Sequence, residues 1–123
     1  MTGVSGPRRR TNPEQGRAAL ARVLAADPPA RADLRDATRY LLEELAARAP
    51  GRTVEVRVPP FGAVQCVDGP RHTRGTPPNV VETDAETWLG LATGGLGWAE
   101  AVATGAVRAS GERADLSDFL PIT

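Results

Sequence analysis

The chain has 123 residues, with 15 basic and 15 acidic side chains that cancel to a formal net charge of zero. This length suits one domain with one hydrophobic core, and the cancelled charge excludes an overall field that would attract nucleic acid or an anionic membrane. The single cysteine, Cys66, excludes an intrachain disulfide and is typical of a reducing compartment. Because no segment reaches the apolar length of a membrane span, we expect a cytoplasmic protein.

The N-terminal residues 1–11 contain two glycines, one proline and three arginines and have no apolar periodicity. This composition predicts a flexible tail, followed by a single domain over residues 12–123. Asn12 followed by a proline is typical of a helix start. The helix predicted there ends before Pro28-Pro29.

A longer helix is predicted from Arg31 to Ala49, where apolar residues recur every three or four positions. Two pairs of opposite charge lie four residues apart on its polar side and predict ion pairs, Arg39 with Glu43 and Glu44 with Arg48. Two helices that precede the strands favour a helical layer over one face of a sheet.

Two strands are predicted next in the chain. Residues 53–58 alternate between valine and polar side chains, which is typical of a strand with one buried face. After Pro59-Pro60, the segment from Phe61 to Val67 is apolar on both faces. We therefore expect the second strand to lie inside the sheet, with helices on one side and a ligand space or a partner on the other.

The loop at residues 68–79 contains the only histidine of the chain. Arg71, His72 and Arg74 project nitrogen-bearing side chains from it and would suit a carboxylate or phosphate head group at a pocket mouth. The alternative is a solvated connection whose arginines pair with nearby acids such as Asp68 or Glu82.

The last third of the chain has the clearest sequence signals. A strand at residues 80–83 leads into a helix whose capping residues are Thr83 or Asp84 and which ends at Gly94-Gly95. A second helix from Trp98 to Gly105 and a strand at residues 107–110 follow. Apolar residues three to four apart predict one closing helical turn before Pro121.

This segment resembles the C-terminal half of the sterol carrier protein 2 family in its short bacterial form. The positions that carry the resemblance are Asp84, Thr87, Leu91, Gly94, Gly105, Val107, Gly111, Leu116 and Phe119. The resemblance implies an α+β fold in which a mixed sheet of about five strands is covered on one face by helices. It also implies an apolar tunnel that takes fatty acyl chains, acyl-CoA or sterols. The sequence itself predicts four strands, and a fifth would have to lie in the loop at 68–79.

The elements that enclose the tunnel in this family carry eight apolar residues here, which are the candidate ligand-binding residues. The alternative for each of them is a place in a packed core, and two tryptophans in one short segment could occupy the space of a tunnel. The candidates are Val64, Cys66, Trp88, Leu91, Trp98, Val102, Phe119 and Leu120.

Catalytic chemistry finds little support in the sequence. Cys66 and His72 would be a nucleophile and a base, but a thiol inside an apolar strand stays protonated. One histidine and one cysteine cannot supply the usual zinc ligand sets. We therefore expect no enzymatic activity, cofactor or metal, and predict a carrier of an apolar ligand. The alternative is a module without a tunnel that mediates protein interaction or homodimerisation, as an accessory to a thiol-dependent isomerase for example.

Overall fold

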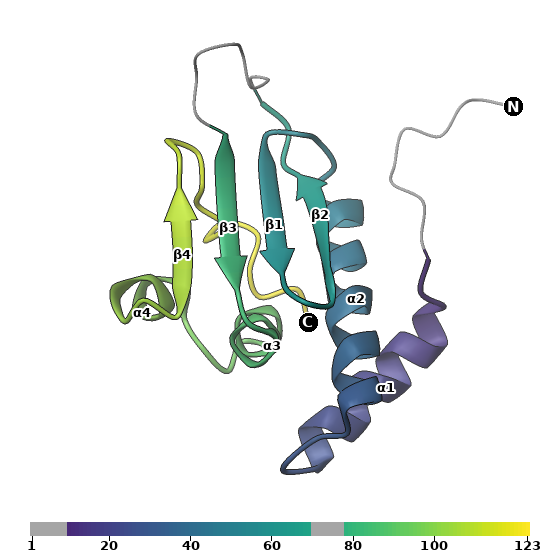
Figure 1. The fold of residues 1–123 in the computed structure, drawn as a ribbon. Coiled ribbons are helices and arrows are strands. Elements are labelled where there is room, and N and C mark those ends of the chain that lie inside the picture. The colour runs from purple at the N-terminus through teal and green to yellow at the C-terminus, as the bar shows by residue number, and fades with distance from the viewer. Residues whose placement is uncertain (1–9, 70–77) are drawn as a thin grey trace, which may run out of the picture.

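The computed structural model describes residues 10–69 and 78–123. In these residues a four-stranded mixed sheet carries helices on one face, and two helices precede the first strand, which confirms the predicted α+β fold (Figure 1). The elements in chain order are α1 (Pro13–Ala25), α2 (Arg31–Arg48), β1 (Val54–Val58), β2 (Gly62–Cys66), β3 (Asn79–Thr83), α3 (Ala85–Thr93), α4 (Trp98–Ala103) and β4 (Val107–Ser110).

The strand order is β2-β1-β3-β4, so β2 and β4 are the edges of the sheet among the described residues. β1 pairs antiparallel with β2 and parallel with β3, and β3 pairs antiparallel with β4. The expectation that the Phe61–Val67 strand lies inside the sheet is therefore wrong. Its outward-facing Ala63 and Gln65 are both exposed to solvent. An apolar strand pattern reports how its faces are buried and not how many strands flank it.

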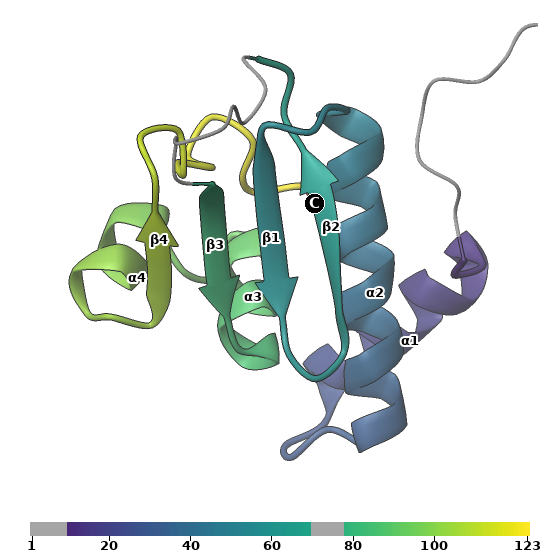
Figure 2. The ribbon, with the colours of Figure 1, turned by 45° about the horizontal axis from the view of Figure 1, so that its top comes forward.

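The two faces of the sheet differ in polarity. Val54, Val56 and Val58 of β1 are fully buried on the face that the helices cover (Figure 2). The opposite face carries charged side chains, which form two ion pairs: Arg57 with Glu55 at 2.8 Å and Arg108 with Glu82 at 2.6 Å. One face therefore belongs to the core and the other to the surface.

Side-chain caps fix the starts of two helices as the sequence predicts. The Asn12 carboxamide oxygen accepts from the backbone N–H groups of Glu14 and Gln15 at the start of α1. Asp84 accepts from the N–H of Thr87 at 2.8 Å and caps α3. α3 ends at Gly94, whose φ of 88° lies in the left-handed region that favours glycine.

The helix pair α1 and α2 packs through a close approach at Gly16. A Cβ atom at this position would lie 2.4 Å from Cγ of Tyr40, so only glycine lets the two helices meet here. Ala19 and Leu20 of α1 are also buried in this contact region. The glycine therefore positions α1 on α2, at the side of the molecule where β2 forms the sheet edge (Figure 2).

The C-terminal segment crosses the helical side of the molecule and confirms the predicted closing turn. The N–H of Phe119 donates to the carbonyl of Leu116 at 2.9 Å, and Leu116 is fully buried. The predicted fifth strand in the loop concerns residues 70–77, which lie outside the described residues. None of the described helices is long and apolar enough to cross a membrane.

Candidate functional site

The eight candidate ligand-binding residues fall into two groups by burial. Cys66, Trp88 and Leu91 are 0%, 1% and 2% exposed, so they belong to the interior of the core. The other five reach the surface to some extent: Val64, Trp98, Phe119 and Leu120 are half-buried and pack against the core, and Val102 is 40% exposed.

Trp88 is fixed in the layer between α2 and α3. Its indole Nε1 donates to the main-chain carbonyl of Thr38 at 3.3 Å. The Thr38 hydroxyl is buried next to this bond and has no hydrogen-bond partner in the described part of the chain. Trp88 thus fills space between α2 and α3 and joins the two helices through one polar contact.

The C-terminal segment covers the core between α2 and α3. The N–H groups of Ile122 and Thr123 both donate to the carbonyl of Ala92, at 2.8 and 3.1 Å. The guanidinium of Arg48 in α2 donates to the carbonyl of Ile122. An irregular segment, held by bonds to α2 and α3, therefore covers the apolar layer here, and its own Ile122 is 5% exposed.

A groove with a volume of about 480 Å³ runs along the edge strand β2. This volume lies in the range of small-ligand and peptide sites. Val64 is the one candidate residue among those that line it. The lining residues are Arg10, Thr11, Arg39, Leu42, Glu43, Ala46, Phe61, Gly62, Ala63 and Val64.

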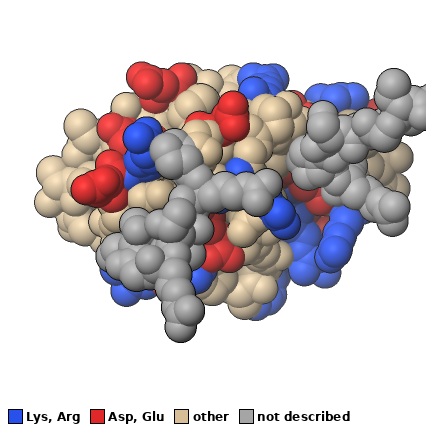
Figure 3. All heavy atoms as spheres, turned by 90° about the horizontal axis from the view of Figure 1, so that it is seen from above, with Lys and Arg blue, Asp and Glu red and all other residues tan. Residues whose placement is uncertain are grey.

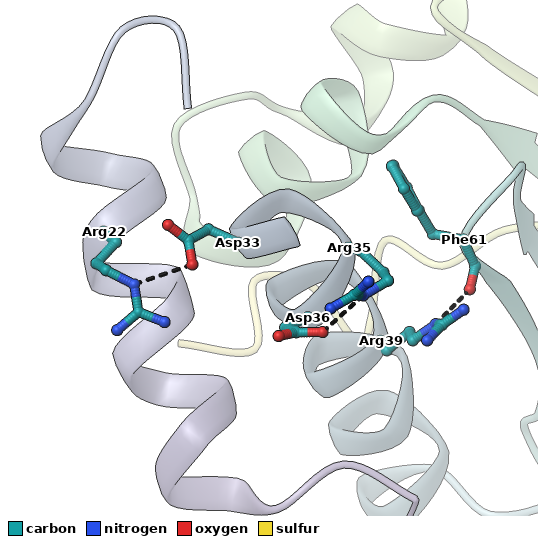
Figure 4. Close-up of polar contacts among 6 residues, drawn as sticks. All are labelled: Arg22, Asp33, Arg35, Asp36, Arg39 and Phe61. Atoms are coloured by element: carbon teal, nitrogen blue, oxygen red, sulfur yellow. Dashed lines mark hydrogen bonds and ion pairs between the residues drawn. The ribbon is translucent and has the colours of Figure 1, made fainter. Parts of the chain in front are cut away.

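The polar contacts around this groove correct one predicted ion pair. Glu43 accepts from the backbone N–H groups of Arg10 and Thr11, at 3.2 and 3.0 Å. The Nε of Arg39 donates instead to the carbonyl of Phe61 at 2.7 Å (Figure 4). The predicted Arg39–Glu43 pair is therefore wrong, because each side chain is used to fix a neighbouring chain segment to α2. The predicted pair of Glu44 and Arg48 is confirmed at 3.5 Å.

A second hollow of about 300 Å³ lies where β3 leads into α3. Glu82, Asp84 and Arg108 give it both signs of charge. Two of these groups already have partners, since Arg108 pairs with Glu82 and Asp84 caps α3. This hollow is smaller and more polar than a site for an apolar ligand would be.

The thiol of Cys66 is poorly suited to nucleophilic chemistry. Burial raises its pKa from 9.0 to about 11, so it stays protonated at neutral pH. Among residues 10–69 and 78–123, no group of three or more His, Cys, Asp or Glu side chains could hold a metal ion. The candidate head-group residues Arg71, His72 and Arg74 lie outside the described residues.

Acidic and basic side chains are interspersed on the face seen from above in Figure 3. The structure therefore shows no large surface of one sign on that face among the described residues. Any electrostatic recognition there depends on individual side chains rather than on a broad field.

Sequence reasoning missed most of the groove residues. The one available signal was the spacing of Arg39 and Glu43 on α2, which we interpreted as a pair on an outer helix face. Leu42 and Ala46 belong to the apolar stripe of the same helix. Their place at the bottom of a groove depends on β2 being an edge strand, which local patterns do not reveal.

A family model described as a bacterial SCP ortholog matches residues 30–122. The match begins at α2 and covers the whole described sheet, α3, α4 and the C-terminal segment. A search of curated proteins found no match. The family match covers most of the chain and agrees with the fold, so it confirms the resemblance to short bacterial sterol carrier proteins, a family of lipid-carrier-type and typically non-catalytic domains. The chain belongs to the bacterial SCP ortholog family.

Proposed function

We propose that this chain is a non-catalytic carrier of an apolar ligand, which binds between the sheet and the helices, with half-buried residues of α4 and of the C-terminal segment at the margin of the site. The ligand class is a fatty acyl chain, an acyl-CoA or a sterol-like lipid. The observation that carries the proposal is the cover of the core at this margin, an irregular segment with half-buried Phe119 and Leu120. Such a cover can move away without unfolding a helix or a strand.

In this proposal, the burial of each candidate wall residue determines where in the site it would contact the ligand. Trp98, Phe119 and Leu120 are half-buried and would contact the ligand first, since they form the margin of the core. Cys66, Trp88 and Leu91 are interior and would line only the deepest part of the site. Val64 belongs to the same apolar layer but lies on the edge strand β2.

The free energy available from such binding is sufficient for a carrier. Burial of eight to ten methylene groups contributes about 6–8 kcal/mol at roughly 0.8 kcal/mol each. Part of this gain is lost to ordering the ligand and to displacing the C-terminal cover, which leaves an affinity of about micromolar order. A carrier that must also release its ligand needs no tighter binding.

The test is a titration of the full chain with a fluorescent fatty acid, followed by displacement with unlabelled palmitate. We expect saturable energy transfer from the tryptophans that palmitate reverses. Leu120→Gln should weaken binding about tenfold, because it places an amide in an apolar wall. Ser117→Gln, at an exposed position of the same segment, is the matched control. A flat titration with folded protein would rule out the carrier.

A further inference from the structure

The edge strand β2 lacks two of the features that commonly protect a sheet edge, charged residues and proline. Edge strands in natural proteins commonly carry charged residues or proline, which hinder pairing with another chain. β2 has the sequence Gly-Ala-Val-Gln-Cys and contains neither. The opposite edge, β4, carries Arg108, whose side chain is 75% exposed. β2 is therefore the edge of this sheet that is suited to accept a further strand.

The groove beside β2 leaves room for a single extended chain. β2 forms one wall, Leu42 and Ala46 of α2 form the floor, and Arg10 with Thr11 forms the opposite wall. That opposite wall is fixed, since both of its backbone N–H groups donate to Glu43. Neighbouring strands lie about 4.8 Å apart, so an added strand would lie above α2 and beside β2.

The position of α2 disfavours a second copy of this chain in the groove. α2 runs alongside β2 at the sheet edge in both views (Figures 1 and 2). A two-fold pairing of β2 with β2 would crowd the two copies of α2 against each other on one face of the joined sheet. A lone extended segment has no such helix and avoids this conflict.

The charges at the groove favour an acidic segment. The two carboxylate oxygens of Glu43 already accept two backbone N–H groups, which compensates this acid locally. Arg39 uses Nε for the Phe61 carbonyl, and no partner of its terminal nitrogens occurs in the described part of the chain. The guanidinium groups of Arg39 and Arg10 therefore leave the groove with an excess of positive charge.

We propose that the groove between β2 and α2 binds one extended peptide segment of a partner protein, which adds a strand to β2. Its apolar side chains face Leu42 and Ala46, and a carboxylate of the segment pairs with Arg39. Strand addition of this kind combines main-chain hydrogen bonds with pockets for alternate side chains. Val64 lines the groove and is also a candidate wall residue of the lipid site, but the peptide proposal does not depend on lipid binding.

The test begins with selection of random ten-residue peptides displayed on phage against the full chain. We expect enriched peptides in which β-branched apolar residues alternate with polar ones and at least one is Asp or Glu. In NMR titrations of the full chain, a selected peptide should shift the amide signals of β2 and of residues 10–11. The amide signals of β4 should not shift.

Two matched pairs of variants locate the site. Ala46→Leu fills the groove floor, whereas Ala47→Leu changes an exposed neighbour that does not line it. Arg39→Gln removes the positive charge, whereas Arg35→Gln changes an exposed arginine that pairs with Asp36 outside the groove. We expect Ala46→Leu and Arg39→Gln each to weaken a selected peptide about tenfold, and both controls to bind as the parent does.

Three outcomes would overturn the proposal. Selection without enrichment above background would mean that the edge is closed to peptides. If the selected peptides bind folded Ala46→Leu and Arg39→Gln as tightly as they bind the parent protein, they occupy another surface. If no peptide is selected and Ala46→Leu binds a fatty acid more weakly than the parent does, the groove is a lipid site. If circular dichroism shows that Ala46→Leu is unfolded, the comparison of Arg39→Gln with its control Arg35→Gln decides whether the groove binds the peptide.

Discussion

The two helices that carry the tryptophans, α3 and α4, illustrate two ways of covering the same face of the sheet. α3 has a side-chain cap at Asp84, a left-handed glycine at its end and five buried residues. α4 is six residues long, has no side-chain cap and buries Ala101 as its one fully covered residue. α3 therefore belongs to a closed core, whereas α4 lies at a margin where side chains such as Trp98 are half-buried. This difference teaches where a ligand could enter without disrupting the fold.

Truncation of the two tryptophans should separate the closed side from the margin most strongly. Trp88→Ala removes a fully buried side chain and its bond to Thr38, so it should lower the free energy of unfolding by about 3–5 kcal/mol. Trp98→Ala removes a half-buried side chain and should cost clearly less. Urea unfolding followed by far-ultraviolet circular dichroism measures both. Equal losses would show that α4 is as closed as α3.

The pH dependence of stability should report the burial of Cys66 in β2. The folded thiol has a pKa of about 11 against an ordinary 9.0. Between these values the unfolded chain has lost this proton while the folded chain keeps it, so the free energy of unfolding falls as the pH rises. Below pH 9 the contribution is fully present. The fall should be on the order of 1–2 kcal/mol.

Cys66→Ala is the control for this measurement, because it removes the thiol and leaves the other titrating groups in place. Its stability should decline less steeply than that of the parent over the same range of pH. If the two curves run parallel from pH 9 to 11, the thiol titrates as an exposed group would, and the core around β2 is more open than the structure indicates.

Local sequence signals predicted most of the helices and strands, but not which strands lie next to one another in the sheet. Asn12, Asp84 and Gly94 act through hydrogen bonds or backbone angles within a few residues, so their roles could be recognised from sequence. The position of β2 at the sheet edge depends on pairing between segments far apart in the chain. An apolar strand can occupy an edge as well as the interior, and only the fold distinguishes the two.

The candidate site shows the same limit. Trp88 and Trp98 both occur at helical spacings with apolar neighbours, yet one is fully buried and the other half-buried. Helical spacing predicts which residues share a face and not how deeply that face is covered. Arg39 likewise lies four residues from Glu43, but the Phe61 carbonyl competes successfully for its Nε.

The most direct test of the carrier proposal uses two proteins that each keep one tryptophan. Trp88→Phe leaves Trp98 on the margin, and Trp98→Phe leaves Trp88 in the closed core. During titration with palmitate, the emission of Trp98 should shift to a saturating limit, whereas that of Trp88 should change little. Unchanged emission from both folded proteins across the titration would contradict a lipid site between the sheet and the helices.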